Sequence, residues 1–213
     1  LLDNGSGTPQ TRVISTGAGV GNLQLAAITG AGNSLSLISG IGTTTVSGAV
    51  SGVNALTLQD YLPGASGTVR FEGDLSATSL TTGADPYSIS LLGSSTTITN
   101  AVTFANTGGL TLGDGDSDSL SFSGGITATA PSMVYVRGNL IATGSSAINL
   151  GDADTAVVIS GNTRIGGPSD ATSSGAITLS GVTLENGSSL TLGDAAATAS
   201  ANLGSNAITL TSV

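Results

Sequence analysis

Apolar and polar residues alternate along most of the chain in short apolar–polar–apolar triplets. Clear examples are Leu56-Thr57-Leu58, Val69-Arg70-Phe71, Val102-Thr103-Phe104, Leu110-Thr111-Leu112, Ile177-Thr178-Leu179 and Leu190-Thr191-Leu192. Successive side chains of a β-strand point to opposite faces of a sheet, so a period of two predicts strands with one buried face. Gly, Asn, Ser or Asp bound each triplet, which limits the expected strands to about four to six residues. Apolar residues at helical spacing are missing, and we predict an all-β protein with essentially no α-helix.

A Leu-Gly-Asp sequence recurs along the second half of the chain, at Leu112-Gly113-Asp114, Leu150-Gly151-Asp152 and Leu192-Gly193-Asp194. The spacings are 38 and 42 residues, and Leu92-Gly93 precedes the first copy by 20. These distances predict a repeat of about 20 residues, with the Asp in roughly every second unit. A unit of that length holds about three short strands, which is typical of one coil of a parallel β-helix. We therefore predict a β-solenoid whose coils of about 20 residues stack at about 4.8 Å, giving about ten coils.

An antiparallel β-sandwich is the alternative architecture, because it also consists of many short strands. Two-residue hairpin sequences are few, aromatic residues number only six, and the 20-residue spacing has no explanation in a sandwich. Residues 1–12 lack the triplets and are expected to form an N-terminal extension or cap. Residues 13–213 are expected to form a single β-solenoid domain.

The triplets also predict which side chains fill the core. Their apolar members should point inward, whereas the intervening Thr111 and Thr191 should face solvent. The residues predicted to be inward are Leu58, Phe71, Phe104, Leu112, Phe122, Leu150, Ile159, Leu179 and Leu192.

The composition narrows the chemistry. Gly, Ser, Thr and Asn make up half of the 213 residues, and Lys, His, Cys and Trp are absent. These absences exclude Ser-His-Asp and Cys-His catalysis, Schiff bases and the usual zinc, haem and iron–sulfur sites. A net charge of −9 disfavours binding to nucleic acid or anionic membranes. A hydrophobic fraction of 38% argues against disorder. No segment approaches the roughly 20 mainly apolar residues of a membrane-spanning helix.

Repeated Leu-Thr-Leu-Gly-Asp and Ala-Ile-Thr-Leu units in a Gly-, Ser-, Thr- and Asn-rich background without Cys resemble a known class of protein segment. They resemble the β-solenoid passages of large bacterial secreted exoproteins, the filamentous-haemagglutinin-like adhesins and autotransporter passengers. The resemblance extends over about residues 20–213. It implies an extended stalk or adhesive shaft located outside the outer membrane.

Three acidic residues at alternate positions, Asp114, Asp116 and Asp118, resemble the first half of a calcium-binding loop. The loop departs from that pattern, because Ser119 stands at position six and Gly125 at position twelve. Asp152, Asp154 and Asp194 would extend these acids into a row along one edge of the solenoid. The alternative is a solvated corner in which Asp side chains accept hydrogen bonds from backbone N–H groups. Calcium is therefore the candidate metal, and no other cofactor is expected.

We expect a non-enzymatic, extracellular or cell-surface β-solenoid with a structural or adhesive role, either a fibre-forming subunit or a segment of a giant surface adhesin. The alternative is a carbohydrate-active β-helix enzyme, since two carboxylates can suffice for glycoside hydrolysis. Tyr135 near Arg137 and Tyr87 near Asp85 are the aromatic–charged pairs closest to such a site, and no catalytic residue is assigned.

The expected partners follow from the open ends of a solenoid, which carry unpaired backbone groups. Residues 206–213 are uncharged and strand-like. We therefore expect end-to-end association with another copy or continuation in a longer chain. A cell-surface glycan or protein receptor is a further expected partner, whereas nucleic acid is not.

Overall fold

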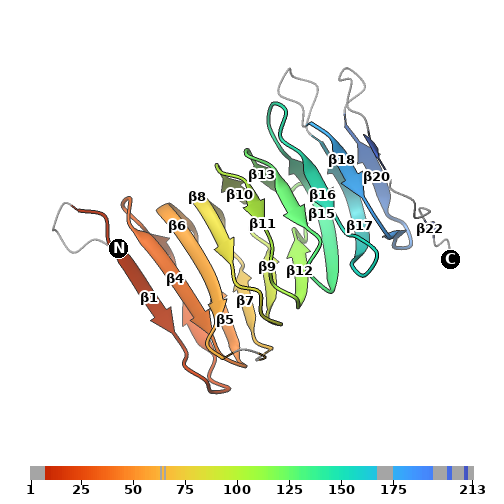
Figure 1. Ribbon diagram of the computed structural model, residues 1–213. Helices are drawn as coiled ribbons and strands as arrows, with labels where there is room; N and C mark the ends of the chain where they lie inside the picture. Colours follow the sequence, from red (N-terminus) through yellow and green to blue (C-terminus); the bar gives the residue numbers. More distant parts are fainter. Residues whose placement is uncertain are drawn as a thin grey trace.

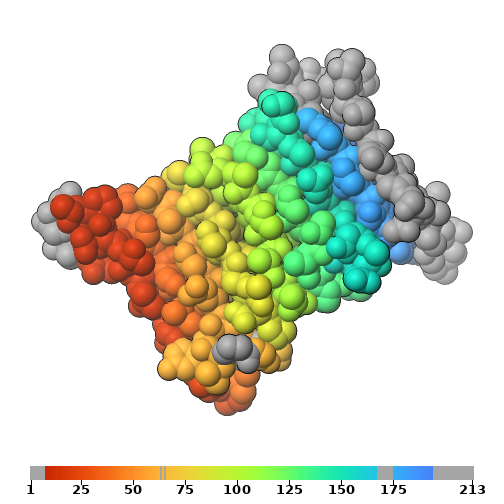
Figure 2. All heavy atoms as spheres, in the orientation of Figure 1, coloured from red at the N-terminus to blue at the C-terminus, as the bar shows by residue number. Residues whose placement is uncertain are grey.

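The computed structural model describes residues 8–62, 64, 66–166, 175–193, 201–202 and 209–210. These residues form strands and turns, with no helix among them. The chain winds into a parallel β-solenoid of about 7 turns, with coils of roughly 23 residues. Figure 1 shows the coils following one another from the red N-terminal end to the blue C-terminal end, and Figure 2 shows them as adjoining bands of atoms. The all-β, parallel β-helix prediction is confirmed.

Each coil has three faces, which we number in chain order. Face 1 contains β1 (Thr11–Ser15), β4 (Ser34–Ser39), the ends of β6 (Val50–Asp60) and β8 (Leu75–Thr82), β11 (Val102–Thr103), β14 (Ile126–Ala128), β16 (Ile148–Leu150), β18 (Ile177–Leu179) and β21 (Ala201–Asn202). Face 2 contains β2 (Leu23–Leu25), β5 (Thr43–Val46), β7 (Thr68–Phe71), β9 (Ser88–Leu91), β12 (Gly109–Leu112), the starts of β15 (Met133–Ile141) and β17 (Ala156–Ile165), β19 (Val182–Leu184) and β22 (Thr209–Leu210). Face 3 contains β3 (Ile28–Thr29), the starts of β6 and β8, β10 (Ser95–Ile98), β13 (Ser119–Phe122), the ends of β15 and β17, and β20 (Ser189–Leu192).

All the strand pairs are parallel and in register, apart from local shifts where a long strand turns a corner. β6 and β8 turn from face 3 to face 1, and β15 and β17 turn from face 2 to face 3. On face 1 the backbone ladder is interrupted between β8 and β11. There the Thr82 hydroxyl accepts a hydrogen bond from the Ala105 backbone N–H at 2.7 Å. A side chain therefore links two coils where the backbone groups do not pair.

The core is one continuous column of apolar side chains. All nine residues predicted to point inward do so, and eight of them are at most 1% exposed. Leu192 is partly buried and packs against the same core. Phe104 and Phe122 meet edge to face with 6.1 Å between ring centroids. Thr111 and Thr191 face outward as predicted, because the alternation of β12 and β20 places their neighbours inside.

The coil is longer than the predicted 20 residues, and the turns number about 7 rather than ten. The Leu-Gly-Asp sequence caused the difference, because it marks corners of different faces and not one position per coil. Its copies follow β12 on face 2, β16 on face 1 and β20 on face 3. The three glycines share positive φ angles, 78° at Gly113, 74° at Gly151 and 64° at Gly193. An inward Leu followed by a left-handed Gly closes any corner of this solenoid, whichever face comes next.

The first strand begins at Thr11, inside the segment 1–12 that the sequence assigned to an extension or cap. Of the stretch 206–213, the structure describes only the two residues of β22, which pair with β19. The other residues of that stretch lie outside the described part. Within the described residues, no helix is long and apolar enough to cross a membrane.

Candidate functional site

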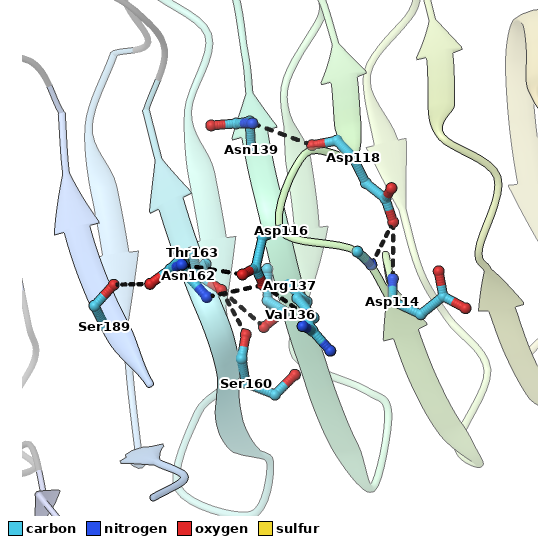
Figure 3. A network of polar contacts seen from close by, with 11 residues as sticks. Asp114, Asp116, Asp118, Val136, Arg137, Asn139, Ser160, Asn162, Thr163 and Ser189 are labelled. Carbon is cyan, nitrogen blue, oxygen red and sulfur yellow. Dashed lines mark hydrogen bonds and ion pairs between the residues drawn. The ribbon is translucent and has the colours of Figure 1, made fainter. Parts of the chain in front are cut away.

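The corner between faces 2 and 3, here called corner 2/3, carries the largest polar network in the described part of the chain (Figure 3). Residues 113–118 connect β12 to β13 there and form a loop that Asp118 closes. The Asp118 carboxylate accepts hydrogen bonds from the backbone N–H groups of Asp114 at 2.9 Å and Gly115 at 2.8 Å. Asp118 is only 5% exposed. Its carboxylate therefore turns inward and satisfies the loop's own backbone donors.

Asp116 points the other way, toward the following coils (Figure 3). Its carboxylate accepts a hydrogen bond from Arg137 Nε at 2.7 Å and forms an ion pair with that guanidinium. It also accepts from the backbone N–H of Asn162 at 3.1 Å and from Asn162 Nδ2 at 3.0 Å. Asn162 Oδ1 in turn accepts from the Ser189 hydroxyl at 2.9 Å. One carboxylate thus ties β15, β17 and β20 together along the corner.

The charges of this network stabilise each other. The hydrogen bond from Arg137 lowers the pKa of Asp116 below its usual value, and the hydrogen bond from the Asn162 backbone lowers it further. The same contact with Asp116 raises the pKa of Arg137. Both groups are solvent-exposed, so the network keeps its charges at all pH values above the acid range.

The three candidate calcium ligands have different surroundings. Asp116 engages Arg137 and Asn162, Asp118 turns into its own loop, and Asp114 is exposed. In the described part of the chain, no three acidic side chains form a group that could hold a metal ion. Asp118 adopts the alternative arrangement foreseen from the sequence, in which the carboxylate bonds backbone N–H groups. Calcium binding at these residues stays a prediction, and it would require Asp116 to leave Arg137.

The expected row of acids along one edge is wrong for the residues that the structure describes. Asp114 lies on corner 2/3, whereas Asp152 follows β16 and lies on the corner between faces 1 and 2. There the Asp152 carboxylate accepts hydrogen bonds from the backbone N–H groups of Asp154 and Thr155, both at 2.9 Å. Asp194 lies outside the described residues. The spacing of 38 residues corresponds to about five faces, so it places successive acids on different corners.

Next to the network, face 3 has a polar hollow of about 160 Å³. We call it the face-3 hollow, and its lining residues are Asp116, Asn139, Asn162, Thr163, Arg164, Ser189 and Thr191. Strand register places Asn139, Arg164 and Thr191 side by side on three successive coils, because Arg164 pairs with Asn139 on one side and Thr191 on the other. The hollow therefore presents a guanidinium between an amide and a hydroxyl.

Arg164 differs from the paired arginines of the described chain. Arg70 forms an ion pair with Glu72 at 2.9 Å, and Arg137 forms one with Asp116 at 2.7 Å. The Arg164 side chain makes no hydrogen bond or ion pair with any residue that the structure describes. Its flanking residues on β17 are buried, so the guanidinium is on the outward side of the strand. This leaves a half-buried positive charge facing the hollow.

Sequence reasoning missed Asn139, Asn162, Arg164 and Ser189, because none of them belongs to a local motif of known chemistry. One signal was available. The dipeptides Gly138-Asn139 and Gly161-Asn162 are 23 residues apart, which is the length of a coil. Using that spacing instead of Leu-Gly-Asp would have placed these polar residues on adjacent coils.

The aromatic residues considered for a sugar cleft are placed apart. Tyr87 is fully buried, and its hydroxyl donates to the Leu58 carbonyl at 2.8 Å and accepts from the Gly83 N–H at 3.0 Å. Burial raises its pKa well above the ordinary value. Tyr135 is 39% exposed on face 2. Tyr87 therefore stabilises the interior and does not present its ring to a ligand.

Comparison with known proteins finds no matching family model, no similar curated protein and no similar solved structure. The arguments on function that follow start from the solenoid and its corner 2/3.

Proposed function

We propose that this protein is a non-enzymatic structural and adhesive element that acts outside the cell or at the cell surface. It serves either as a fibre-forming subunit or as a segment of a giant surface adhesin. The regular stacking of coils around one apolar column supports this proposal, because such a scaffold is extended and repeats its surface from coil to coil. The likeness to solenoid passages of secreted adhesins points in the same direction.

The outward rows provide the adhesive surface in this proposal. Outward positions on face 1 include Thr57, Thr127 and Thr178, each between buried apolar neighbours. Face 3 adds the amides, hydroxyls and guanidinium around corner 2/3. Polar side chains held at the stacking distance of about 4.8 Å form a preorganised surface for many weak contacts.

Two measurements on the full chain test this proposal. Negative-stain electron microscopy should show rods of uniform width or filaments built from them. Incubation with a panel of polysaccharides should release no new reducing ends. Release of reducing ends that follows protein concentration, and that Asp116→Asn abolishes while Glu72→Gln does not, would instead support the carbohydrate-active enzyme.

A further inference from the structure

We propose that the face-3 hollow binds a carboxylate-bearing sugar, such as one uronate unit of an acidic polysaccharide, with the Arg164 guanidinium contacting its carboxylate. The inference deepens the adhesive part of the proposed function and rests on it.

The charge distribution provides the first argument. The chain has a net charge of −9, so an arginine on its surface has many acids to choose from. Arg164 nevertheless has no acidic partner among the described residues, although Asp116 lines the same hollow. Arg137 and Asn162 hold Asp116 through three hydrogen bonds. The Asp116 charge is thereby neutralised locally, and Arg164 is left to bind an acid from outside.

The second argument comes from the polar groups beside Arg164. Asn139 uses its Nδ2 to donate to the Asp118 carbonyl at 3.3 Å, which leaves its Oδ1 free of any partner in the described chain. Thr191 is exposed on the following coil. A planar guanidinium binds a carboxylate through two parallel hydrogen bonds. The amide oxygen and the hydroxyl on either side suit the hydroxyl groups that a sugar ring carries next to its carboxylate.

The size of the hollow limits the bound unit. A volume of about 160 Å³ corresponds to about five water molecules at about 30 Å³ each. This space accommodates part or all of one sugar ring and excludes a folded protein partner. The rest of a polysaccharide would lie along the polar outer surface of face 3.

An acidic peptide fits the same place less well. Extended peptides bind sheets mainly by adding a strand at an edge with free backbone groups. The hollow lies over β15, β17 and β20, which pair with one another through their backbones. Recognition there depends on side chains alone, which favours a ligand rich in hydroxyl groups.

The test is isothermal titration calorimetry with the full chain. The ligands are a galacturonic acid oligomer, a neutral galactose oligomer of the same length, and a polyglutamate peptide. We expect binding of the uronate oligomer only. Arg164→Gln should weaken it by about tenfold or more, since a hydrogen-bonded charge pair is lost. Arg70→Gln is the matched control, because it removes the same charge from β7 on face 2, and it should change the affinity less than about twofold.

Thr191→Val provides a second variant on an exposed position and should weaken binding by about three- to tenfold through loss of one hydroxyl. Circular dichroism of each variant confirms that the fold is retained. Equal binding of the neutral oligomer, equal binding of polyglutamate, or an unchanged affinity of Arg164→Gln would each overturn the inference. Binding of neutral sugars would leave the adhesive function standing. Rods that bind no sugar at all would leave only the structural function standing.

Discussion

Corner 2/3 is built in two ways along the same solenoid. In the N-terminal half, Gly48, Gly73 and Gly93 follow one another on successive coils. A Cβ on Gly73 would overlap the backbone of Gly48, and one on Gly93 would overlap the backbone of Gly73. In the C-terminal half the same corner contains the Asp114–Asp118 loop, Arg137 and Asn162.

The difference shows how a solenoid corner acquires chemistry. The glycine stack closes the corner by backbone proximity and leaves no side chain outside. The polar half needs side chains to link the coils, and those side chains create the hollow beside them. Gly161 connects the two solutions, because its φ of 60° turns the chain and a Cβ there would collide with the Asp116 carboxylate and the Arg137 guanidinium.

The largest effects are expected where the two halves are alike. Leu91 precedes the glycine corner, Leu112 precedes the polar loop, and the two residues pair directly on face 2. Both are fully buried. Leu91→Ala and Leu112→Ala should each lower the free energy of unfolding by about 2–5 kcal/mol in urea denaturation, through lost burial and cavity formation. A clearly smaller loss for one of them would mean that the core itself differs between the halves.

Substitution of the glycines should separate the two corners. Gly73→Ala forces a Cβ into the backbone of the preceding coil, which cannot move without breaking its ladder, and should cost about 3 kcal/mol. Gly161→Ala meets only side chains that can shift, and its positive φ should cost about 1–2 kcal/mol. Thermal unfolding of the two variants measures the order. Equal melting temperatures would contradict the view that only the N-terminal corner depends on backbone contact.

Within the polar half, Asp118 should matter more than its neighbour. Asp118→Ala leaves the N–H groups of Asp114 and Gly115 without acceptors and should cost about 1–3 kcal/mol. Amide hydrogen exchange at these two positions should accelerate. Asp114→Ala is the control, because the Asp114 side chain is exposed, and it should leave the exchange unchanged. Equal acceleration in both variants would show that Asp118 does not close the loop.

The smallest effect is expected for the exposed ion pair. Because the pKa of Asp116 is lowered in the folded state, its contribution to stability is present above the ordinary value of 3.8. It is lost as the pH falls through the lowered folded-state pKa. Asp116→Asn should therefore melt slightly below the parent at pH 7, and the difference should vanish near pH 3. A difference that persists in acid would mean that the carboxylate's charge is not what links the coils.

Much of the fold follows from the sequence alone. The alternation of Leu110-Thr111-Leu112 and the similar triplets predicts strands, burial and the inward side chains, because a period of two leaves one solution for each strand. Gly, Ser, Thr and Asn at the triplet ends predict tight corners. These are local properties, and neighbouring residues determine them.

Only the tertiary structure decided the coil length, the assignment of strands to faces and the composition of corner 2/3. The Leu-Gly-Asp sequence occurs at corners of three different faces, so its spacing cannot reveal the length of a coil. Asp116 and Asn162 are 46 residues apart, and Arg164 and Thr191 are 27 apart. Their proximity depends on the summed lengths of all the intervening corners, which vary from coil to coil. A local pattern therefore determines the direction of each side chain, whereas the accumulated winding of the chain determines which side chains meet.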